Sequence, residues 1–297
     1  HLFQQSLLEL KNCFVQLLPL AQNKQPELCF YLGLLARLLL SSVIDGDRRD
    51  TVEFMLQKKQ HRLHPDRAKC YRSALATLEQ KLQTFSADTP IQRARRNISD
   101  ACYHMAQEPS GLYALNVPTG AGKTLASLRY ALAHSITHHR QRIFFVMPLL
   151  SIIEQNSAAI RSAIGDPSLI LEHHSNVVRE TGSSEELSRQ ELLTENWDAP
   201  ITITTLVQFL ETLFSGKTSA IRRFQSLCSS VIVIDEVQTV PTNMLTLFDL
   251  AVNFLVKVCG ATVVLCSATQ SSLEKEDHPL FCTPQPIVPY DNALWQI

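Results

Sequence analysis

A short glycine-rich loop carries the residues best suited to chemistry. It joins an apolar stretch at residues 112–117 to a stretch with helical spacing of apolar residues from residue 124 onward. This order of strand, loop and helix suits a phosphate-binding site, because glycines let successive backbone N–H groups point at one anion. The predicted nucleotide-binding residues of the loop are Pro118, Thr119, Gly120, Ala121, Gly122, Lys123 and Thr124.

Two side chains of this loop supply a charge and a metal ligand. Lys123 is predicted to neutralise the β- and γ-phosphates of ATP, and the Thr124 hydroxyl is predicted to bind the Mg²⁺ of the nucleotide. The loop departs from the usual phosphate-loop pattern at Val117, where the pattern has glycine. The part that faces the phosphates, Gly-x-Gly-Lys-Thr, is intact, so ATP and Mg²⁺ are the predicted cofactors.

A pair of carboxylates follows the apolar run at residues 231–234. Asp235 is predicted to hold the Mg²⁺, and Glu236 is predicted to orient and deprotonate the attacking water. Gln238 follows two residues later and is predicted to lie in the nucleotide site. The predicted catalytic residues are therefore Lys123, Asp235 and Glu236.

A third polar group again comes directly after an apolar stretch. Ser267, Ala268 and Thr269 follow the run at residues 261–266. They are predicted to couple the state of the γ-phosphate to a polynucleotide track. The tripeptide alone carries little information, and its position after the other two motifs gives it weight.

Beyond residue 111, strand-like and helical stretches alternate. Strands buried on both faces and joined by helices predict an α/β fold with a parallel, doubly wound sheet, and ligands bind such sheets at the carboxyl ends of the strands. Residues 1–60 have helical spacing instead, with a nearly all-apolar segment at 28–40. The predicted strands are 112–117, 143–147, 169–171, 201–204, 231–234 and 261–266, and the helices between them 124–138, 151–164, 206–214, 220–227 and 244–258.

Length and composition narrow the class of protein. A chain of 297 residues with 45% hydrophobic and 19% charged residues is typical of one large or two ordinary globular domains. The net charge of −1 gives no overall basic field for nucleic acid, although a local groove would suffice. We expect no membrane partner, because Arg37 interrupts the longest apolar run, at 28–43. The 8 cysteines include no C-x-x-C pair, which predicts reduced thiols in a cytoplasmic protein.

Aspartates at positions 45, 47 and 50 lie close together near the end of the apolar N-terminal segment. Such a group is compatible with metal binding. It is equally compatible with a helix end whose exposed acids pair with Arg48 and Arg49. The residues alone favour the helix end, because no histidine lies close in the sequence to complete a transition-metal site.

The three motifs in this order resemble those of superfamily 2 helicases. The stretches at 145–156, 171–176 and 204–216 are similar to the CRISPR-associated helicase-nuclease of type I systems. The Asp-Gly-Asp of residues 45–47 resembles the last motif of that family's HD nuclease domain. On this resemblance Asp47, rather than Asp45, is a ligand of a divalent transition metal. The His173-His174 pair is expected to belong to the helicase part and not to the nuclease.

The resemblance also implies a domain organisation. Residues 1–60 would be the C-terminal helices of an HD nuclease domain, 61–90 a linker with a linker helix, and 91–297 the first RecA-like ATP-binding domain. The first nuclease ligands are expected upstream of residue 1 and the second RecA-like domain downstream of residue 297. The chain alone is therefore expected to be inactive.

The function implied is an ATP-dependent translocase or helicase on single-stranded DNA, coupled to a metal-dependent DNA nuclease. It would act in CRISPR interference on R-loop DNA, as a monomer recruited by an RNA-guided surveillance complex. Gln92 would read the adenine, as the glutamine upstream of the phosphate loop does in many relatives. Three alternatives stay open: an RNA helicase of superfamily 2 without nuclease activity, a nucleotide-binding switch without turnover, and a P-loop small-molecule kinase.

Overall fold

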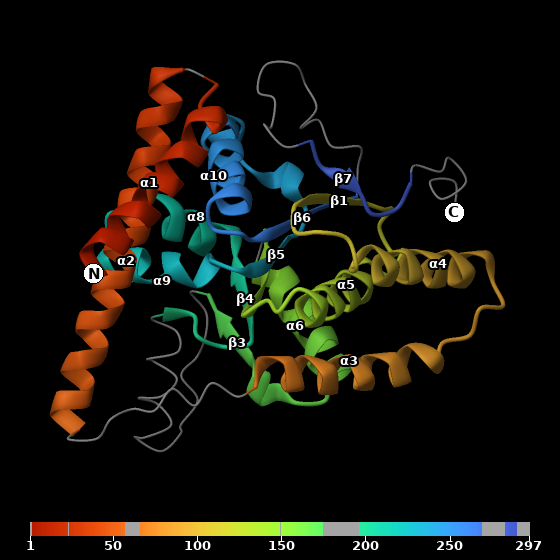
Figure 1. Cartoon of the computed structure of the whole chain (residues 1–297). Helices are drawn as coiled ribbons and strands as arrows, with labels where there is room; N and C mark the ends of the chain where they lie inside the picture. The colour runs from red at the N-terminus through yellow and green to blue at the C-terminus, as the bar shows by residue number, and fades with distance from the viewer. Residues whose placement is uncertain are drawn as a thin grey trace.

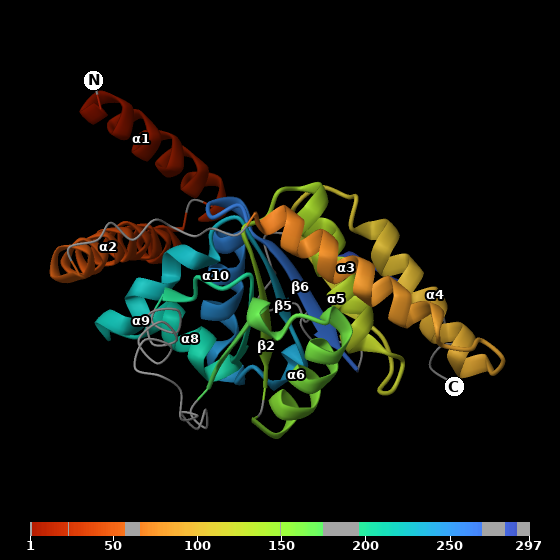
Figure 2. The same cartoon turned by 90° about the horizontal axis from the view of Figure 1, so that it is seen from below.

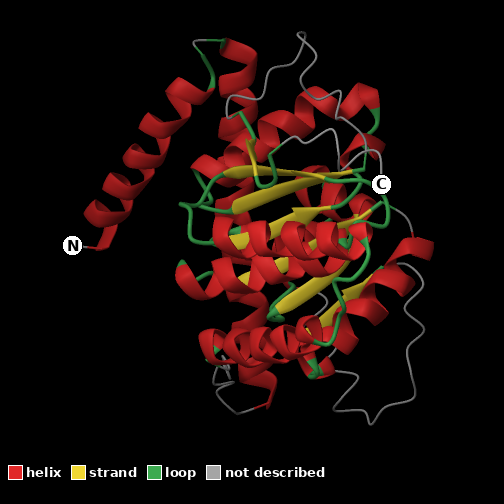
Figure 3. Cartoon of the chain, turned by 90° about the vertical axis from the view of Figure 1, so that its right-hand side faces the viewer, coloured by secondary structure: helices red, strands yellow, loops and turns green. Residues whose placement is uncertain are grey.

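The computed structural model describes residues 2–22, 24–56, 66–148, 150–174, 196–268 and 283–289. Its centre is a seven-stranded sheet in the order β3-β4-β2-β5-β6-β1-β7, in which every pairing is parallel. Helices cover both faces of the sheet (Figures 1 and 3). The predicted parallel, doubly wound α/β sheet is confirmed.

The strands form where the sequence has unbroken apolar or β-branched runs. Every residue of β4, β5 and β6 is buried, as expected of strands that are covered on both faces. β7 was not predicted, because two residues give no periodicity. The strands are β1 (Leu112–Asn116), β2 (Arg142–Met147), β3 (Ile170–His173), β4 (Ile201–Thr205), β5 (Ser230–Ile234), β6 (Thr262–Ser267) and β7 (Gln285–Pro286).

Strand order decides which motifs meet. β6 lies between β1 and β5, with Asn116 opposite Ser267 and Ile234 opposite Leu265. The carboxyl ends of these three strands therefore lie side by side. Each of them leads directly into one of the three sequence motifs.

Helices pack on the two faces in separate groups (Figure 2). Two hydrophobic cores result, one on each side of the sheet. The predicted helix at 220–227 is instead an α-helix followed by a 3-10 turn. One face carries α3 (Arg67–Gln83), α4 (Pro90–Met105), α5 (Lys123–Thr137) and α6 (Leu150–Ile164), and the other carries α8 (Leu206–Phe214), α9 (Thr218–Arg223), the turn η2 (Phe224–Leu227) and α10 (Leu245–Lys257).

The N-terminal residues form two helices, α1 (Leu2–Leu20) and α2 (Gln25–Leu56). α2 runs without a break through residues 45–50, so the expectation of a helix end at the aspartates was wrong. The physical reason is that the packing of α2 on α9 and η2 outweighs the helix-breaking tendency of Gly46. Gly46 is the one glycine there, and it lies inside the helix.

Residues 25–51 of α2 are also long and apolar enough to cross a membrane, with a mean hydropathy of 1.7. In the sequence we considered the apolar run at 28–43 and set it aside, because Arg37 interrupts it. In the structure Arg37 Nε donates to the carbonyl of Thr212 (3.0 Å). This face of the helix thus makes polar contacts with the α/β domain.

A buried ion pair fixes α2 to the α/β domain. Arg222 Nε donates to Asp45 Oδ1 at 3.0 Å, and the two side chains are 5% and 6% exposed. Arg49 Nη2 lies 2.7 Å from the other carboxylate oxygen of Asp45. Ser41 Oγ donates to the carbonyl of Arg222 (2.9 Å) and accepts from the amide of Gln225 (3.0 Å). Asp45 is therefore a structural residue of this junction.

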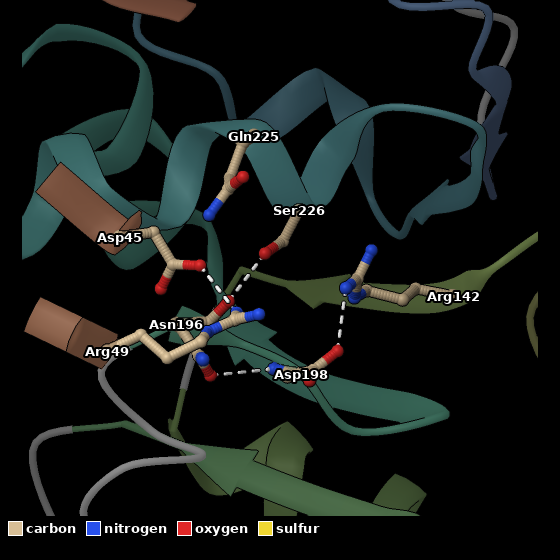
Figure 4. A pocket seen from close by; sticks show the side chains of 7 residues that line it. All are labelled: Asp45, Arg49, Arg142, Asn196, Asp198, Gln225 and Ser226. Carbon is tan, nitrogen blue, oxygen red and sulfur yellow. Dashed lines mark hydrogen bonds and ion pairs between the residues drawn. The ribbon is translucent and has the colours of Figure 1, made fainter. Parts of the chain in front are cut away.

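A small polar pocket adjoins the ion pair (Figure 4). On its far wall, Asp198 accepts hydrogen bonds from Arg142 (2.6 Å) and Arg67 (3.2 Å). Arg67 begins α3, so this wall also holds α3 against the sheet. Tyr71, one turn later, donates to the carbonyl of Pro200 (2.9 Å).

We predict that Asp45→Asn lowers the free energy of unfolding by about 3 kcal/mol, since it leaves the Arg222 guanidinium buried without its carboxylate. Burial alone would raise the pKa of Asp45, but hydrogen bonds from Gln225 and Arg222 and the charge of Arg49 hold it below its ordinary value. The stabilisation is therefore complete at neutral pH and is lost as the pH falls below about 4.

Urea denaturation at pH 7 and pH 3 measures this difference. The matched control is Asp47→Asn, because Asp47 lies on the same helix and is exposed. An equal effect of both substitutions, or a cost independent of pH, would contradict the assigned role of Asp45.

Candidate functional site

The glycine-rich loop curls at the carboxyl end of β1. Gly120 and Gly122 have φ values of +81° and +82°, a left-handed conformation that other residues adopt only with strain. Arg95 of α4 donates from Nε to the carbonyl of Gly120 (2.8 Å) and holds the loop from outside. Val117 is fully buried, and its amide donates to the carbonyl of Ser267 (3.2 Å). Val117 thus extends β1, and the phosphate loop proper begins after it.

Helix α5 begins at Lys123, directly after Gly122. The N–H groups of its first turn have no partner within the helix, and the helix dipole favours an anion at this end. The loop and the helix together form the anion-binding geometry predicted from the sequence.

Lys123 lies between the two predicted carboxylates. Its Nζ is 2.7 Å from Asp235 Oδ1 and also contacts Glu236 Oε1. Burial disfavours the charged ammonium, but the two carboxylates outweigh it and raise the pKa of Lys123. Likewise burial disfavours the Glu236 carboxylate, but Lys123 and Gln238 outweigh it and lower its pKa. Lys123 is therefore a cation and Glu236 an anion at neutral pH.

Glu236 has a left-handed backbone, with φ +49° and ψ +51°. Its amide donates to Asp235 Oδ1 (3.0 Å), and its carbonyl accepts from Thr239 Oγ1 (2.8 Å). Such a conformation costs about 1–3 kcal/mol and persists where the surrounding structure over-determines it. The turn aims the Glu236 side chain at the phosphate loop.

A chain of hydrogen bonds joins the second motif to the third. Gln238 Nε2 donates to Glu236 Oε2 (2.6 Å), and Ser267 Oγ donates to Gln238 Oε1 (3.0 Å). The backbone of Ala268 also hydrogen bonds to Glu236. Thr269 lies outside the described residues. The structure thus brings Lys123 and the described residues of the other two motifs into one connected site.

A comparison with known families agrees with this geometry. The model of the DEAD/DEAH box helicase family matches residues 89–276. The chain belongs to the DEAD/DEAH box helicase family. The matched residues include all three motifs. The second motif here reads Asp-Glu-Val-Gln, whereas the family is named after Asp-Glu-Ala-Asp and Asp-Glu-Ala-His. As a member of this family, the domain is expected to use ATP and Mg²⁺.

Individual relatives indicate a narrower group of helicases than the family model does. The chain is 26% identical, over 67% of its length, to the "CRISPR-associated nuclease/helicase Cas3" of Haloferax volcanii, and it spans about a quarter (25%) of that protein. The predicted likeness to CRISPR-associated helicases is thus confirmed. The structure of T. fusca Cas3 with ATP is 22% identical over 57% of this chain and 20% of that chain (TM-score 0.47). The DUF1998 helicase MrfA is 16% identical over 72% and 32% (TM-score 0.43).

One contact of the helicase site was not predicted. Thr124 Oγ1 donates to Asn156 Oδ1 (3.1 Å), which ties the phosphate loop to α6. The sequence placed Asn156 only at the end of a family-like stretch, without a role. A hydroxyl and a carboxylate, from Thr124 and Asp235, are the oxygen ligands that Mg²⁺ prefers, so these residues fit the predicted metal.

Gln92 lies at the start of α4, where it completes a capping box. Its side-chain oxygen accepts from the amides of Asp88 and Thr89 (both 3.0 Å), and its own amide donates to Thr89 Oγ1 (3.3 Å). This contact positions α4, which also carries Arg95. The reading of adenine by Gln92 stays a prediction.

The metal assignments of the N-terminal region stay predictions as well. Among the described residues no group of three or more His, Cys, Asp and Glu is arranged to hold a metal ion. Both carboxylate oxygens of Asp45 bind guanidinium groups, whereas Asp47 is exposed. His173 is held in the helicase domain by a hydrogen bond from Trp197 Nε1 (3.2 Å). Burial, followed by the charge of Arg223, lowers its pKa to about 3, so the ring is neutral.

We predict that Lys123→Ala weakens the binding of ATP by at least about 10-fold, since it removes the only cation that contacts both site carboxylates in the described part of the chain. The two carboxylates would then face the phosphates without compensation. Fluorescence titration with a labelled ATP analogue measures the change. Lys257→Ala, an exposed lysine at the end of α10, is the control and should bind as the unaltered chain does. Equal affinity of both variants would contradict the role of Lys123.

Proposed function

We propose that the chain is the ATP-binding part of a motor that moves along single-stranded DNA. One observation carries the proposal: the continuous contact from Lys123 through Glu236 and Gln238 to Ser267. A site that only bound a nucleotide would need the lysine but not the relay. The relay supports a coupling between phosphate chemistry and a polynucleotide track.

The residues divide the chemistry between them. The phosphate loop and Lys123 would hold the triphosphate, and Thr124 and Asp235 would hold its Mg²⁺, which offsets the charge of the phosphates. When Lys123 turns to the phosphates, Glu236 loses the cation that lowers its pKa and becomes a stronger base for a water molecule. Gln238 would pass this change in Glu236 to Ser267 at the end of β6.

The DNA side of the proposal rests on the relatives. The Haloferax volcanii protein is named as a CRISPR-associated nuclease and helicase. We infer that this chain acts on R-loop DNA opened by an RNA-guided surveillance complex, in the cytoplasm and as a monomer, and passes the strand to a metal-dependent nuclease that includes Asp47. The modest net charge of −1 is compatible with a DNA strand that is bound through its phosphates in one local groove.

We predict that Glu236→Gln lowers the rate of ATP hydrolysis by about 10²- to 10⁴-fold, since the amide cannot accept the proton of water. ATP binding should persist, because Lys123 and the loop remain. The assay measures phosphate release by the complete protein with single-stranded DNA, single-stranded RNA or neither. Strong stimulation by DNA supports the proposal. Stimulation by RNA alone would instead favour an RNA helicase without nuclease activity, and stimulation by neither would favour a switch.

A second prediction separates the motor from the nuclease. Lys123→Ala should abolish ATP-driven movement and leave the metal-dependent cutting of free single strands, since the lysine contacts only the nucleotide site. Asp47→Ala should abolish the metal-dependent cutting and leave ATP hydrolysis and ATP-driven movement unchanged. A streptavidin-displacement assay and a cleavage assay on labelled single strands measure the two activities. Loss of both activities in one correctly folded variant would contradict this division.

A further inference from the structure

Two cysteines lie opposite each other at the amino ends of β5 and β6, at the edge of the sheet away from the nucleotide site. The strands pair in parallel with Val231 opposite Thr262. The ladder continues outward, because the amide of Ser229 donates to the carbonyl of Cys259 (2.9 Å). Three residues before the pair Val231–Thr262, this register places Cys228 opposite Cys259.

The two cysteines share one hydrophobic cluster, in which Cys259 is buried and against which Cys228 packs. The Cys259 side chain is hydrogen bonded to that of Cys228. Neighbouring strands lie about 4.8 Å apart, and a disulfide joins Cα atoms about 4.4–6.8 Å apart. Two cysteines that keep this strand spacing lie within the reach of a disulfide.

The surroundings favour one reactive and one resolving sulfur. Cys228 is partly exposed and Cys259 is buried. The hydrogen bond from Cys259 lowers the pKa of Cys228, against the effect of burial, and the positive charge of Arg142 lowers it further. Arg142 points from the start of β2 to Asp198 (Figure 4), and its Nε atom is buried without a hydrogen-bond partner in the described part of the chain. A partly exposed thiol beside a cation is the reactive kind.

We propose that Cys228 and Cys259 form a reversible disulfide when the protein meets hydrogen peroxide. The Cys228 thiolate attacks one peroxide oxygen, so that an S–O bond forms, the O–O bond breaks, and the other oxygen takes a proton and leaves as water. The Cys259 sulfur, having lost its proton, then displaces the hydroxyl group from Cys228, and a second water leaves. The thiols lose two electrons and the peroxide is reduced to two waters.

The bond would tie together the two strands that carry the site residues. β5 leads to Glu236 and β6 ends at Ser267, both at the opposite edge of the sheet. The disulfide would close the loop between Cys228 and Cys259, so it restricts the unfolded chain and raises the melting temperature. Nucleotide binding should persist, since the strands keep their register.

Peptide mapping of the full chain tests the proposal. The reduced protein is treated with hydrogen peroxide, the remaining thiols are alkylated, and the digest is analysed by mass spectrometry. The expected product is the Cys228 peptide joined to the Cys259 peptide, two hydrogens lighter than their sum and separated again by dithiothreitol. The melting temperature should rise with the cross-link and fall on reduction. Alkylation of both cysteines after peroxide would overturn the proposal.

Three variants sharpen the result. Cys259→Ser should leave Cys228 as a sulfenic acid that dimedone captures, and Cys228→Ser should give neither the cross-link nor dimedone capture at Cys259. Cys29→Ser is the matched control, because Cys29 is an exposed thiol on α2, and it should not change the yield of the cross-link. A cross-link that depends on Cys29 would overturn the proposal as well. Should a variant fail to fold, the peptide map of the unaltered chain decides.

Discussion

The position of one ammonium group between two carboxylates organises this protein. Lys123 lies at the start of α5, and Asp235 and Glu236 lie at the end of β5, so the contact spans the sheet from one motif to another. The Lys123 side chain is 14% exposed, and the side chains of Asp235 and Glu236 are 11% and 22% exposed. In such surroundings an uncompensated charge costs several kcal/mol, so the three groups must stay together or meet other charges. A triphosphate with its Mg²⁺ supplies those charges.

The same constraint explains why the third motif matters. Glu236 is held by Lys123 on one side and by Gln238 on the other, and Gln238 is held by Ser267. A change in the partner of Lys123 therefore changes the hydrogen bonds of a residue on β6. β6 lies between β1 and β5 in the sheet, so a movement of Ser267 at its end would also displace the ends of β1 and β5. This arrangement is the basis of the proposed coupling between ATP hydrolysis and movement along DNA.

A second buried pair joins the N-terminal helices to the helicase domain. Asp45 and Arg222 are far apart in the sequence and almost fully buried together. Beside them, Ser41 Oγ donates a hydrogen bond to the carbonyl of Arg222 and accepts one from the amide of Gln225. The long helix α2 is thereby fixed against α9 and η2 on the face of the sheet that α10 also covers. This leaves Asp47 exposed.

The sequence by itself determined the order of the elements and the three motifs. Unbroken apolar runs become strands and helical spacing becomes helices because both depend on near neighbours, and the left-handed loop glycines follow from the same local chemistry. Only the tertiary structure decided which distant side chains meet: Asp45 with Arg222, Thr124 with Asn156, and Cys228 with Cys259. These pairs depend on strand order and helix packing, which no local pattern encodes. For the same reason, the sequence does not distinguish Asp45 from Asp47, whereas in the structure Asp45 forms a buried ion pair and Asp47 is exposed.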